Sequence, residues 1–218
     1  FMGQKVQDAV VAFVREKYAE SHFSKLKISW FGGEPLLRLD IIEALSSRFI
    51  DFCVENDVEN IAHVLTNARL ANTDVAKRLA ACGVQSVMPS LDGIGERHDC
   101  RRCARSGEKT FQTIMDNIDA LAAEGILVNC SFLTDESNFD DFHELGRQLY
   151  AKENVLVRAT QLRNYHDDDG ISDTGIRVTT RDEYARQYFK FFMDQNPSLE
   201  DVEHALEPIH TFCGTPLH

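Results

Sequence analysis

The sequence lacks any hydrophobic run near the roughly 20 residues that a membrane-spanning helix needs, and its first residues lack the layout of a secretory signal peptide. It is also poor in positive charge, because 23 Lys and Arg residues against 35 Asp and Glu residues leave a formal net charge of −12. A surface this acidic repels phosphate backbones and anionic lipid, so we expect no nucleic-acid partner and no membrane contact. The Gly-x-Gly-x-x-Gly, P-loop and Gly-x-Ser-x-Gly motifs are absent too, which removes the common dinucleotide, nucleotide and hydrolase functions.

Cysteine is present without the pattern of a disulfide framework. The six cysteines are Cys53, Cys82, Cys100, Cys103, Cys130 and Cys213. Isolated thiols are typical of a reducing compartment, so we expect a cytoplasmic protein with Cys53, Cys82 and Cys130 in its hydrophobic core. Cys100 and Cys103 have the spacing of half a zinc or iron–sulfur site or of a redox pair, and unligated thiols on an exposed loop are the simpler interpretation.

Strand-like and helix-like segments alternate along the chain. The expected strands are 26–31, 61–65, 86–91, 126–133 and 155–162, and the expected helices are 6–19, 39–54, 72–82, 110–124, 138–151 and 180–195. This alternation predicts an α/β fold with about five parallel strands, because parallel strands need long crossover connections. A doubly wound sheet and a partial (β/α) barrel both fit the periodicity. We expect one domain over residues 1–196, with loops at 92–109 and 166–175, followed by a tail over 197–218.

The most informative segment is Trp-Phe-Gly-Gly-Glu-Pro-Leu-Leu, residues 30–37. It follows the first expected strand, at the edge where parallel α/β sheets bind ligands. Two adjacent glycines let a backbone approach a ligand closely and expose its N–H and C=O groups. The carboxylate of Glu34 can receive an ammonium group, although a plain strand-to-helix turn with a capping acid would also explain Gly-Gly-Glu.

The segment Ser29–Leu37 resembles the one after the second strand of radical S-adenosylmethionine (SAM) enzymes. The resemblance is closest to the subfamily with a C-terminal SPASM or related auxiliary-cluster domain, such as anaerobic sulfatase-maturating enzymes and peptide maturases. Other segments agree in order. Leu65-Thr66-Asn67 resembles the family's Thr-Asn-Gly, and Phe212-Cys213-Gly214 resembles the start of the auxiliary domain. Between them, Ser90-Leu91-Asp92-Gly93 with His98, Asp99 and Arg102 resembles the family's Ser-Leu-Asp-Gly…His-Asp-x-x-Arg. The resemblance implies a partial (β/α) barrel without its first strand, and it makes residues 197–218 a linker into a truncated auxiliary domain.

The resemblance also implies a cofactor site and a reaction. SAM and a [4Fe–4S] cluster would be the cofactors, and SAM cleavage would give a 5′-deoxyadenosyl radical that abstracts hydrogen from a peptide or protein substrate. The residues expected at the methionine end of SAM are Gly32, Gly33, Glu34 and Pro35, with Glu34 toward the ammonium group. Those expected at its ribose and carboxylate are Thr66, Asn67, Ser90 and Asp92. The candidate metal ligands are Cys213, for an auxiliary cluster of the parent enzyme, and Cys100 and Cys103.

One departure from the family pattern stands out. The family's Cys-x3-Cys-x2-Cys cluster loop lies upstream of the leading helix, where this chain has only residues 1–4. We therefore expect the chain as given to bind no cluster and to be inactive, through truncation, proteolysis or descent as a pseudoenzyme. Without a first strand, the strand at 26–31 would have an unpaired edge and would favour dimerisation. The alternatives from other classes are a non-catalytic βα domain that binds a peptide or partner protein, and a thiol-redox or zinc module built on Cys100 and Cys103.

Overall fold

The computed structural model describes residues 2–104, 106–135, 137–161 and 186. The expected loop 166–175, the expected helix 180–195 (apart from residue 186), the tail 197–218 and Cys213 lie outside the described residues. The chain divides into two compact units, one made of Phe1–Phe132 and Leu149–Arg158, the other of Leu133–Gln148 and the residues from Ala159 on. Each unit is described by itself.

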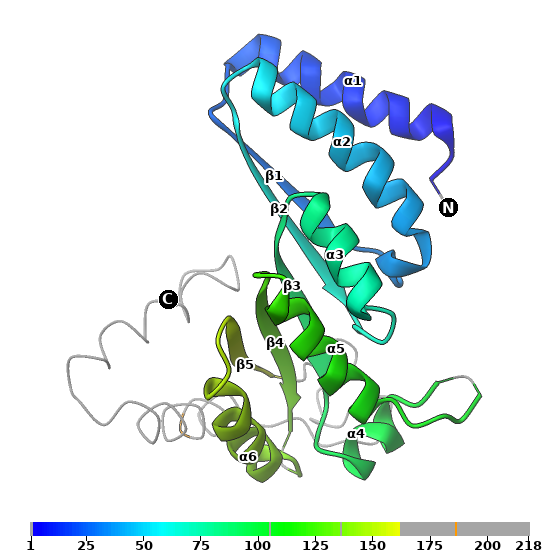
Figure 1. Cartoon of the computed structure of the whole chain (residues 1–218), viewed down its shortest axis with the longest axis vertical. Coiled ribbons are helices and arrows are strands. Elements are labelled where there is room, and N and C mark those ends of the chain that lie inside the picture. The colour runs from blue at the N-terminus through cyan, green and yellow to red at the C-terminus, as the bar shows by residue number, and fades with distance from the viewer. Residues whose placement is uncertain (1, 105, 136, 162–185, 187–218) are drawn as a thin grey trace, which may run out of the picture. The chain divides into compact units, whose positions relative to one another are not determined.

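The strands form a single parallel sheet in the order β1-β2-β3-β4-β5 (Figure 1). Their bounds are Lys25–Trp30 for β1, Glu59–Thr66 for β2, Val84–Leu91 for β3, Leu127–Thr134 for β4 and Val155–Gln161 for β5. Strands that follow one another in space as they do in sequence wind in one direction, as in a (β/α) barrel, whereas a doubly wound sheet reverses its order at a switch point. The observed order confirms the partial barrel.

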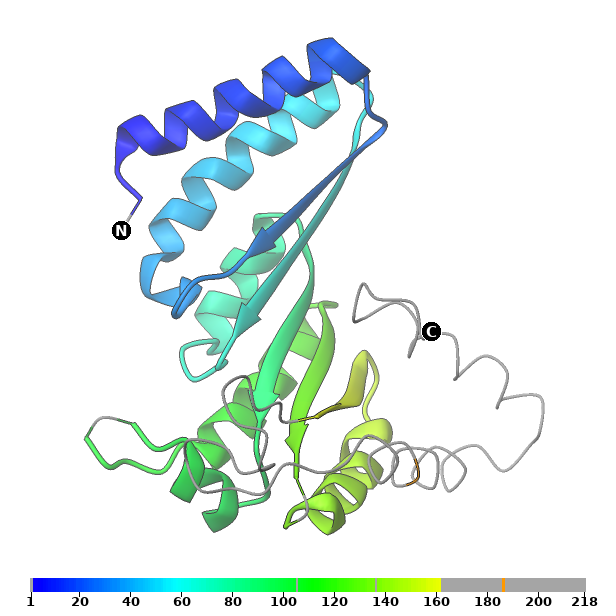
Figure 2. The ribbon, with the colours of Figure 1, turned by 180° about the vertical axis from the view of Figure 1, so that it is seen from behind.

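The helices of the first unit pack on one face of the sheet or against the helices that do so. They are α1 (Gln4–Ser21), α2 (Leu39–Glu55), α3 (Thr73–Ala81), α4 (Glu96–Arg101) and α5 (Phe111–Ala123), with the short 3-10 helix η1 at Pro35–Arg38. Helix α2 packs on β2, α3 and α5 pack on β3, and α1 lies against α2. Figure 2 turns the molecule to the opposite face of these strands, where none of α1, α2, α3 and α5 lies. Helix α6 (Phe139–Tyr150) belongs to the second unit except for its last two residues.

The alternation of side chains along β1 assigns its two faces. Leu26, Ile28 and Trp30 pack against a buried cluster from α1 and α2, which consists of Val11, Ile41, Leu45 and Phe49. Successive side chains of a strand point to opposite faces, so Lys25, Lys27 and Ser29 lie on the face away from these helices. Burying one such apolar side chain stabilises a fold by about 1.5–3 kcal/mol, so the helix-facing row holds β1 in its register.

The periodicity predicted the elements well, with one exception. Each described helix and strand that was expected is present, and its ends lie within about two residues of the expected ends. The segment 92–109, expected to be a loop, instead contains α4, which begins after Gly95, a residue with a positive φ of 53°. Only one side of β1 is paired among the described strands, as expected, and dimerisation through that edge stays a prediction. No helix within the described part of the chain is both long and apolar enough to span a bilayer.

Candidate functional site

The turn after β1 leads directly into η1. Pro35 occupies the first position of η1, where its missing N–H costs nothing and its fixed φ suits a helical start. Glu34 is the N-cap, and its Oε1 accepts a hydrogen bond from the backbone N–H of Leu36 at 3.1 Å. The local sequence therefore accounts for a tight strand-to-helix turn, one of the two interpretations that the sequence left open.

The same carboxylate ties this turn to the end of β2. The hydroxyl of Thr66 donates to Glu34 Oε1 at 2.6 Å, and the backbone N–H of Asn67 donates to Oε2 at 2.9 Å. These bonds bring together three residues that the sequence assigned to one site. A carboxylate has about four acceptor positions, so the three hydrogen bonds of Glu34 leave about one on Oε2 for a further donor.

The two glycines of the turn have no structural reason to be glycine. A Cβ added at Gly32 or Gly33 would meet no described atom within 4 Å, and neither residue has the left-handed backbone that favours glycine. Gly83 shows the contrast, because its φ is +68° and a Cβ there would lie 3.4 Å from Ile50. The open space beside Gly32 and Gly33 therefore fits a group from outside the chain that approaches the backbone closely.

The end of β2 is held by a side chain from α5. Ala68 has a left-handed backbone with φ 58°, at the position where the resembled motif carries glycine. That conformation costs a non-glycine residue roughly 1–2 kcal/mol. The side-chain amide of Asn117 donates to the carbonyl oxygens of Ala68 at 2.8 Å and Arg69 at 3.0 Å, and Asn67 Oδ1 accepts from the Arg69 N–H at 2.9 Å. These contacts fix the turn that presents Asn67.

The two site candidates on β3 have different surroundings. Ser90 is half-buried and lies on the face of the sheet away from the helices. Asp92 is buried, and its Oδ2 accepts a hydrogen bond from Arg102 Nε at 2.7 Å. The backbone N–H of Asp92 donates to His98 Nδ1 at 3.2 Å. Asp92 thus belongs to an internal ion pair, while Ser90 lies on the open side of its strand.

The His98-Asp99-x-x-Arg102 segment connects α4 to the start of α5 by hydrogen bonds. Asp99 Oδ1 accepts hydrogen bonds from the backbone N–H groups of Thr110 at 2.7 Å and Phe111 at 2.9 Å, where α5 begins. Partial burial raises the pKa of Asp99, but these two N–H groups and the nearby positive charge of Lys109 oppose it, and the net result is a lowered pKa. The side chain of His98 is fully buried, and burial lowers its pKa, so it stays neutral near pH 7. Sequence patterning missed this role, and the one available indication was an acidic residue upstream of a helix start.

The cysteines divide as the sequence predicted. Cys53, Cys82 and Cys130 are buried, and Cys100 and Cys103 are exposed free thiols. Within the described ranges, no group of three or more His, Cys, Asp and Glu side chains is arranged to hold a metal ion. The described residues therefore do not fit a [4Fe–4S] cluster, which needs about three or four thiolates in one place, and they do not complete a zinc site around Cys100 and Cys103.

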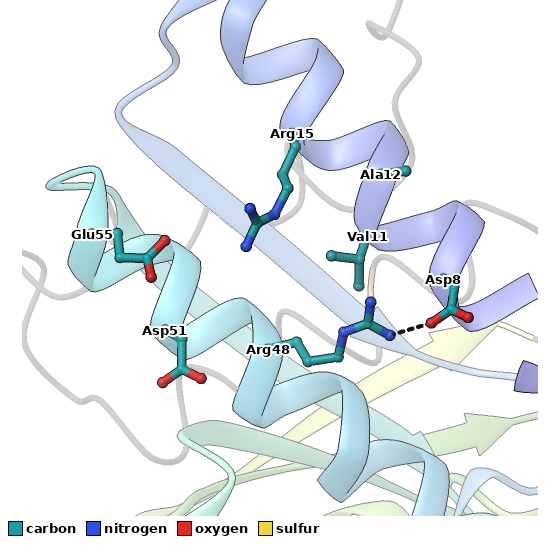
Figure 3. A pocket seen from close by; sticks show the side chains of 7 residues that line it. All are labelled: Asp8, Val11, Ala12, Arg15, Arg48, Asp51 and Glu55. Carbon is teal, nitrogen blue, oxygen red and sulfur yellow. Dashed lines mark hydrogen bonds and ion pairs between the residues drawn. The ribbon is translucent and has the colours of Figure 1, made fainter.

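A separate groove of about 310 Å³ lies between α1 and α2 (Figure 3). Its lining is mostly charged and consists of Asp8, Val11, Ala12, Arg15, Arg48, Asp51 and Glu55. Arg48 donates to Asp8 across the groove at 2.9 Å. No residue that the sequence assigned to the SAM site lines this groove, so it forms no part of the candidate site.

Residues 4–149 match the family model of the Radical SAM superfamily. Among curated proteins, the chain is 27% identical to an uncharacterised protein of Methanocaldococcus jannaschii over 130 residues, which are 59% of this chain and 43% of that protein. It is 29% identical to the GTP 3′,8-cyclase of Saccharophagus degradans over 114 residues, 52% of this chain and 31% of the cyclase. The chain thus spans less than half the length of the curated relatives it matches.

Two solved structures are similar in fold. Native anSMEcpe with bound AdoMet, an anaerobic sulfatase-maturating enzyme, has a TM-score of 0.71 and 17% identity, covering 89% of this chain and 52% of its own. Coproporphyrinogen III oxidase from Escherichia coli, described as a radical SAM enzyme, has a TM-score of 0.52 and 15% identity, covering 89% of this chain and 46% of its own. At these identities the likeness shows the fold, a partial barrel of parallel strands.

Proposed function

The chain belongs to the radical SAM superfamily, and we propose that it is the barrel core of an enzyme that binds SAM at the turn Gly32–Pro35. The single observation that carries this site is the carboxylate of Glu34, which joins the open Gly32–Gly33 turn to Thr66 and Asn67 and keeps about one acceptor position for a further donor. Exposed apolar side chains flank the turn, with Phe31 76% and Leu37 62% exposed. Open backbone beside apolar surface suits a ligand with polar and apolar parts, as SAM is.

Within this proposal, Glu34 has two tasks. It holds the glycine backbone in place through its bonds to Thr66, Asn67 and Leu36. Its remaining acceptor position would take the methionine ammonium of SAM in a charge-assisted hydrogen bond, roughly twice as strong as a neutral one.

We assign different roles to the two residues at the end of β3. The hydroxyl of Ser90 would contact the ribose or the carboxylate of SAM directly, because it lies on the open side of the strand. Asp92 would act indirectly, since its Oδ2 is committed to Arg102 and its side chain is 9% exposed. Its ion pair would hold the β3 end in the shape that presents Ser90.

In this family SAM bound at a [4Fe–4S] cluster supplies a 5′-deoxyadenosyl radical, which we propose abstracts a hydrogen atom from a peptide or protein substrate. The described residues of this chain do not fit that cluster. We propose that the full-length protein carries the Cys-x3-Cys-x2-Cys loop before Phe1, and an auxiliary-cluster domain that Cys213 introduces. The peptide assignment is supported by the resemblance to SPASM-type maturases and by the fold shared with anSMEcpe, one structure of which carries AdoMet and a Cp18Cys peptide.

The experiment uses the full-length protein, reconstituted anaerobically with iron and sulfide, and measures SAM affinity and 5′-deoxyadenosine formation. Glu34→Gln keeps the size of the side chain but loses its charge and one of its acceptor oxygens. Losing a charged hydrogen-bond partner costs about 1.5–3 kcal/mol, so we expect SAM affinity to fall about 10- to 100-fold. The matched control is Glu16→Gln on the exposed surface of α1, which should behave as wild type. Equal SAM affinity in the Glu34→Gln and Glu16→Gln proteins would reject the site.

A further inference from the structure

A row of hydrogen-bond donors crosses the sheet on the face away from the helices of the first unit. In the register of the sheet, Ser29 of β1 lies beside His63 of β2, and His63 lies beside Ser86 of β3. The Ser29 Oγ and the His63 Nε2 are 2.7 Å apart, which shows that both side chains are on the same face. In the register of the sheet, a serine of β1 and a serine of β3 thus flank His63.

A lysine adds positive charge to this row. Lys27 precedes Ser29 by two residues on β1, so its side chain is on the same face. Burial lowers the pKa of His63, and the positive charge of Lys27 lowers it further, in agreement with their closeness. The Lys27 side chain is exposed and His63 is half-buried, so within the described residues the group is open to a ligand.

The charge of Lys27 has no opposing carboxylate among the described residues. Lys25, the next cation on this face toward the start of the strand, forms an ion pair with Glu59 at 2.8 Å. No Asp or Glu lies within ion-pair distance of Lys27 in the described part of the chain, although the protein carries a net charge of −12. An unopposed ammonium beside neutral hydrogen-bond donors is the arrangement that binds an oxyanion.

We propose that Lys27, Ser29 and His63 form a subsite that binds an oxyanion of the substrate, a carboxylate or a phosphate. The ammonium offers three N–H donors. The bond between Ser29 and His63 leaves one further donor for the anion, either the Ser29 hydroxyl when Nε2–H donates to its oxygen, or the imidazole Nδ1–H when the hydroxyl donates to Nε2. The identification of the bound anion as part of the substrate rests on the proposed function, whereas the anion binding itself does not. The carboxylate would come from an acidic residue or chain end of a peptide, and the phosphate from a nucleotide.

A simpler explanation of Lys27 predicts different behaviour. Edge strands often carry lysine to prevent pairing with the edge of another molecule, and β1 is at the edge of the described sheet. In that case Lys27→Met would promote self-association and leave anion binding unchanged. The effect of the Lys27 charge on the pKa of His63 and the absence of an ion pair to Lys27 among the described residues favour the subsite, because an edge-blocking lysine needs neither.

The test measures anion binding to the full-length protein without added SAM and without cluster reconstitution, so it is independent of the test of the SAM site. The histidines are labelled with ¹⁵N, the His63 signal is identified by its loss in His63→Gln, and inorganic phosphate or acetate is titrated at constant ionic strength. We expect a saturable shift of the His63 signal. Lys27→Met should weaken binding by about fivefold or more, and Lys27→Arg should stay within about twofold of wild type.

Lys25→Met is the matched control, because it removes a lysine from the same strand and face whose charge is already paired with Glu59. It should stay within about twofold of wild type. Tighter binding of phosphate than of acetate would identify a phosphate-bearing substrate, and the reverse order would identify a carboxylate. A shift that does not saturate, equal losses in Lys25→Met and Lys27→Met, or self-association of Lys27→Met in sedimentation velocity with unchanged anion binding would overturn the subsite.

Discussion

Asp99 supplies the capping hydrogen bonds at the start of α5 that the side chain of the N-cap residue does not make. The cost of removing Asp99 can be estimated from these bonds. The N-cap residue of α5, Thr110, makes no capping bond with its own side chain and instead donates its hydroxyl to the carbonyl oxygen of Arg102 at 2.6 Å. Asp99 Oδ1 accepts from the N–H of the N-cap residue Thr110 and from that of Phe111, the first residue of the helix. Asp99→Ala leaves both donors without this partner. Loss of an N-cap costs about 0.5–2 kcal/mol, and two bonds to one charged oxygen favour the upper half of that range.

The assay is hydrogen exchange with mass spectrometry, resolved to peptides that cover the start of α5. A loss of about 1–2 kcal/mol predicts exchange about 5- to 30-fold faster for the amides of Thr110 and Phe111. The control is Asp116→Ala in the same helix. Its carboxylate is exposed and, among the described residues, accepts a side-chain hydrogen bond from Gln112 alone, so the change should stay below about 0.5 kcal/mol. Equal exchange at the α5 start in both variants would refute the capping role of Asp99.

The pH dependence gives a second readout of the same contact. The pKa of Asp99 is lowered in the folded protein, so the contact contributes stability above the unfolded-state value, near 3.9, and loses it as the pH falls through the lower folded value. The difference in stability between wild type and Asp99→Ala should therefore be complete at neutral pH and disappear in strong acid. A difference that persists unchanged below that range would show that the carboxylate charge is not involved.

Two further predictions concern the segment around α4 and the cysteines. Arg102→Met leaves the buried carboxylate of Asp92 without its guanidinium partner. The free energy of unfolding, measured in urea, should fall by about 1–2 kcal/mol, a value discounted because Arg102 is 37% exposed. Adding Asp92→Asn to this variant should restore part of the loss. In the native protein at pH 8, iodoacetamide should label Cys100 and Cys103, which are exposed, but spare Cys130, because burial raises the pKa of Cys130 to about 12. Peptide mapping by mass spectrometry after denaturation checks this.

Hydrophobic periodicity was sufficient to predict the strands and the long helices, because each has a buried row with a regular spacing. The helix α4 was missed because it has six residues, too few to show a period, and its position depends on contacts made elsewhere in the chain. Asp99, for example, meets α5 residues 11 and 12 positions later in sequence. Such contacts follow from the tertiary fold and not from local pattern.

The contact between the ends of β1 and β2 was predicted from the sequence, but the bonds made by the individual residues were not. That residues at the ends of β1 and β2 would meet followed from parallel strands that all point one way, and the bond between Thr66 and Glu34 agrees. The spacing could not show that Glu34 would accept three hydrogen bonds inside the protein, because two of its partners are Thr66, the last residue of β2, and Asn67, which follows it. The ion pair of Asp92 with Arg102 could not be predicted from the sequence either, since it depends on the position of α4.

The most direct test of the central claim, that the turn after β1 binds SAM, is calorimetric titration of SAM into the reconstituted full-length protein carrying Gly33→Ala. The added methyl group meets no described atom within 4 Å, so the variant should fold with unchanged or slightly higher stability, by about 0.4–1 kcal/mol. Gly3→Ala, also in open space, is the control and should bind SAM as wild type does. We predict that Gly33→Ala loses SAM affinity about tenfold or more while its thermal unfolding temperature is unchanged or slightly raised. Wild-type SAM affinity in a folded Gly33→Ala protein would contradict the account.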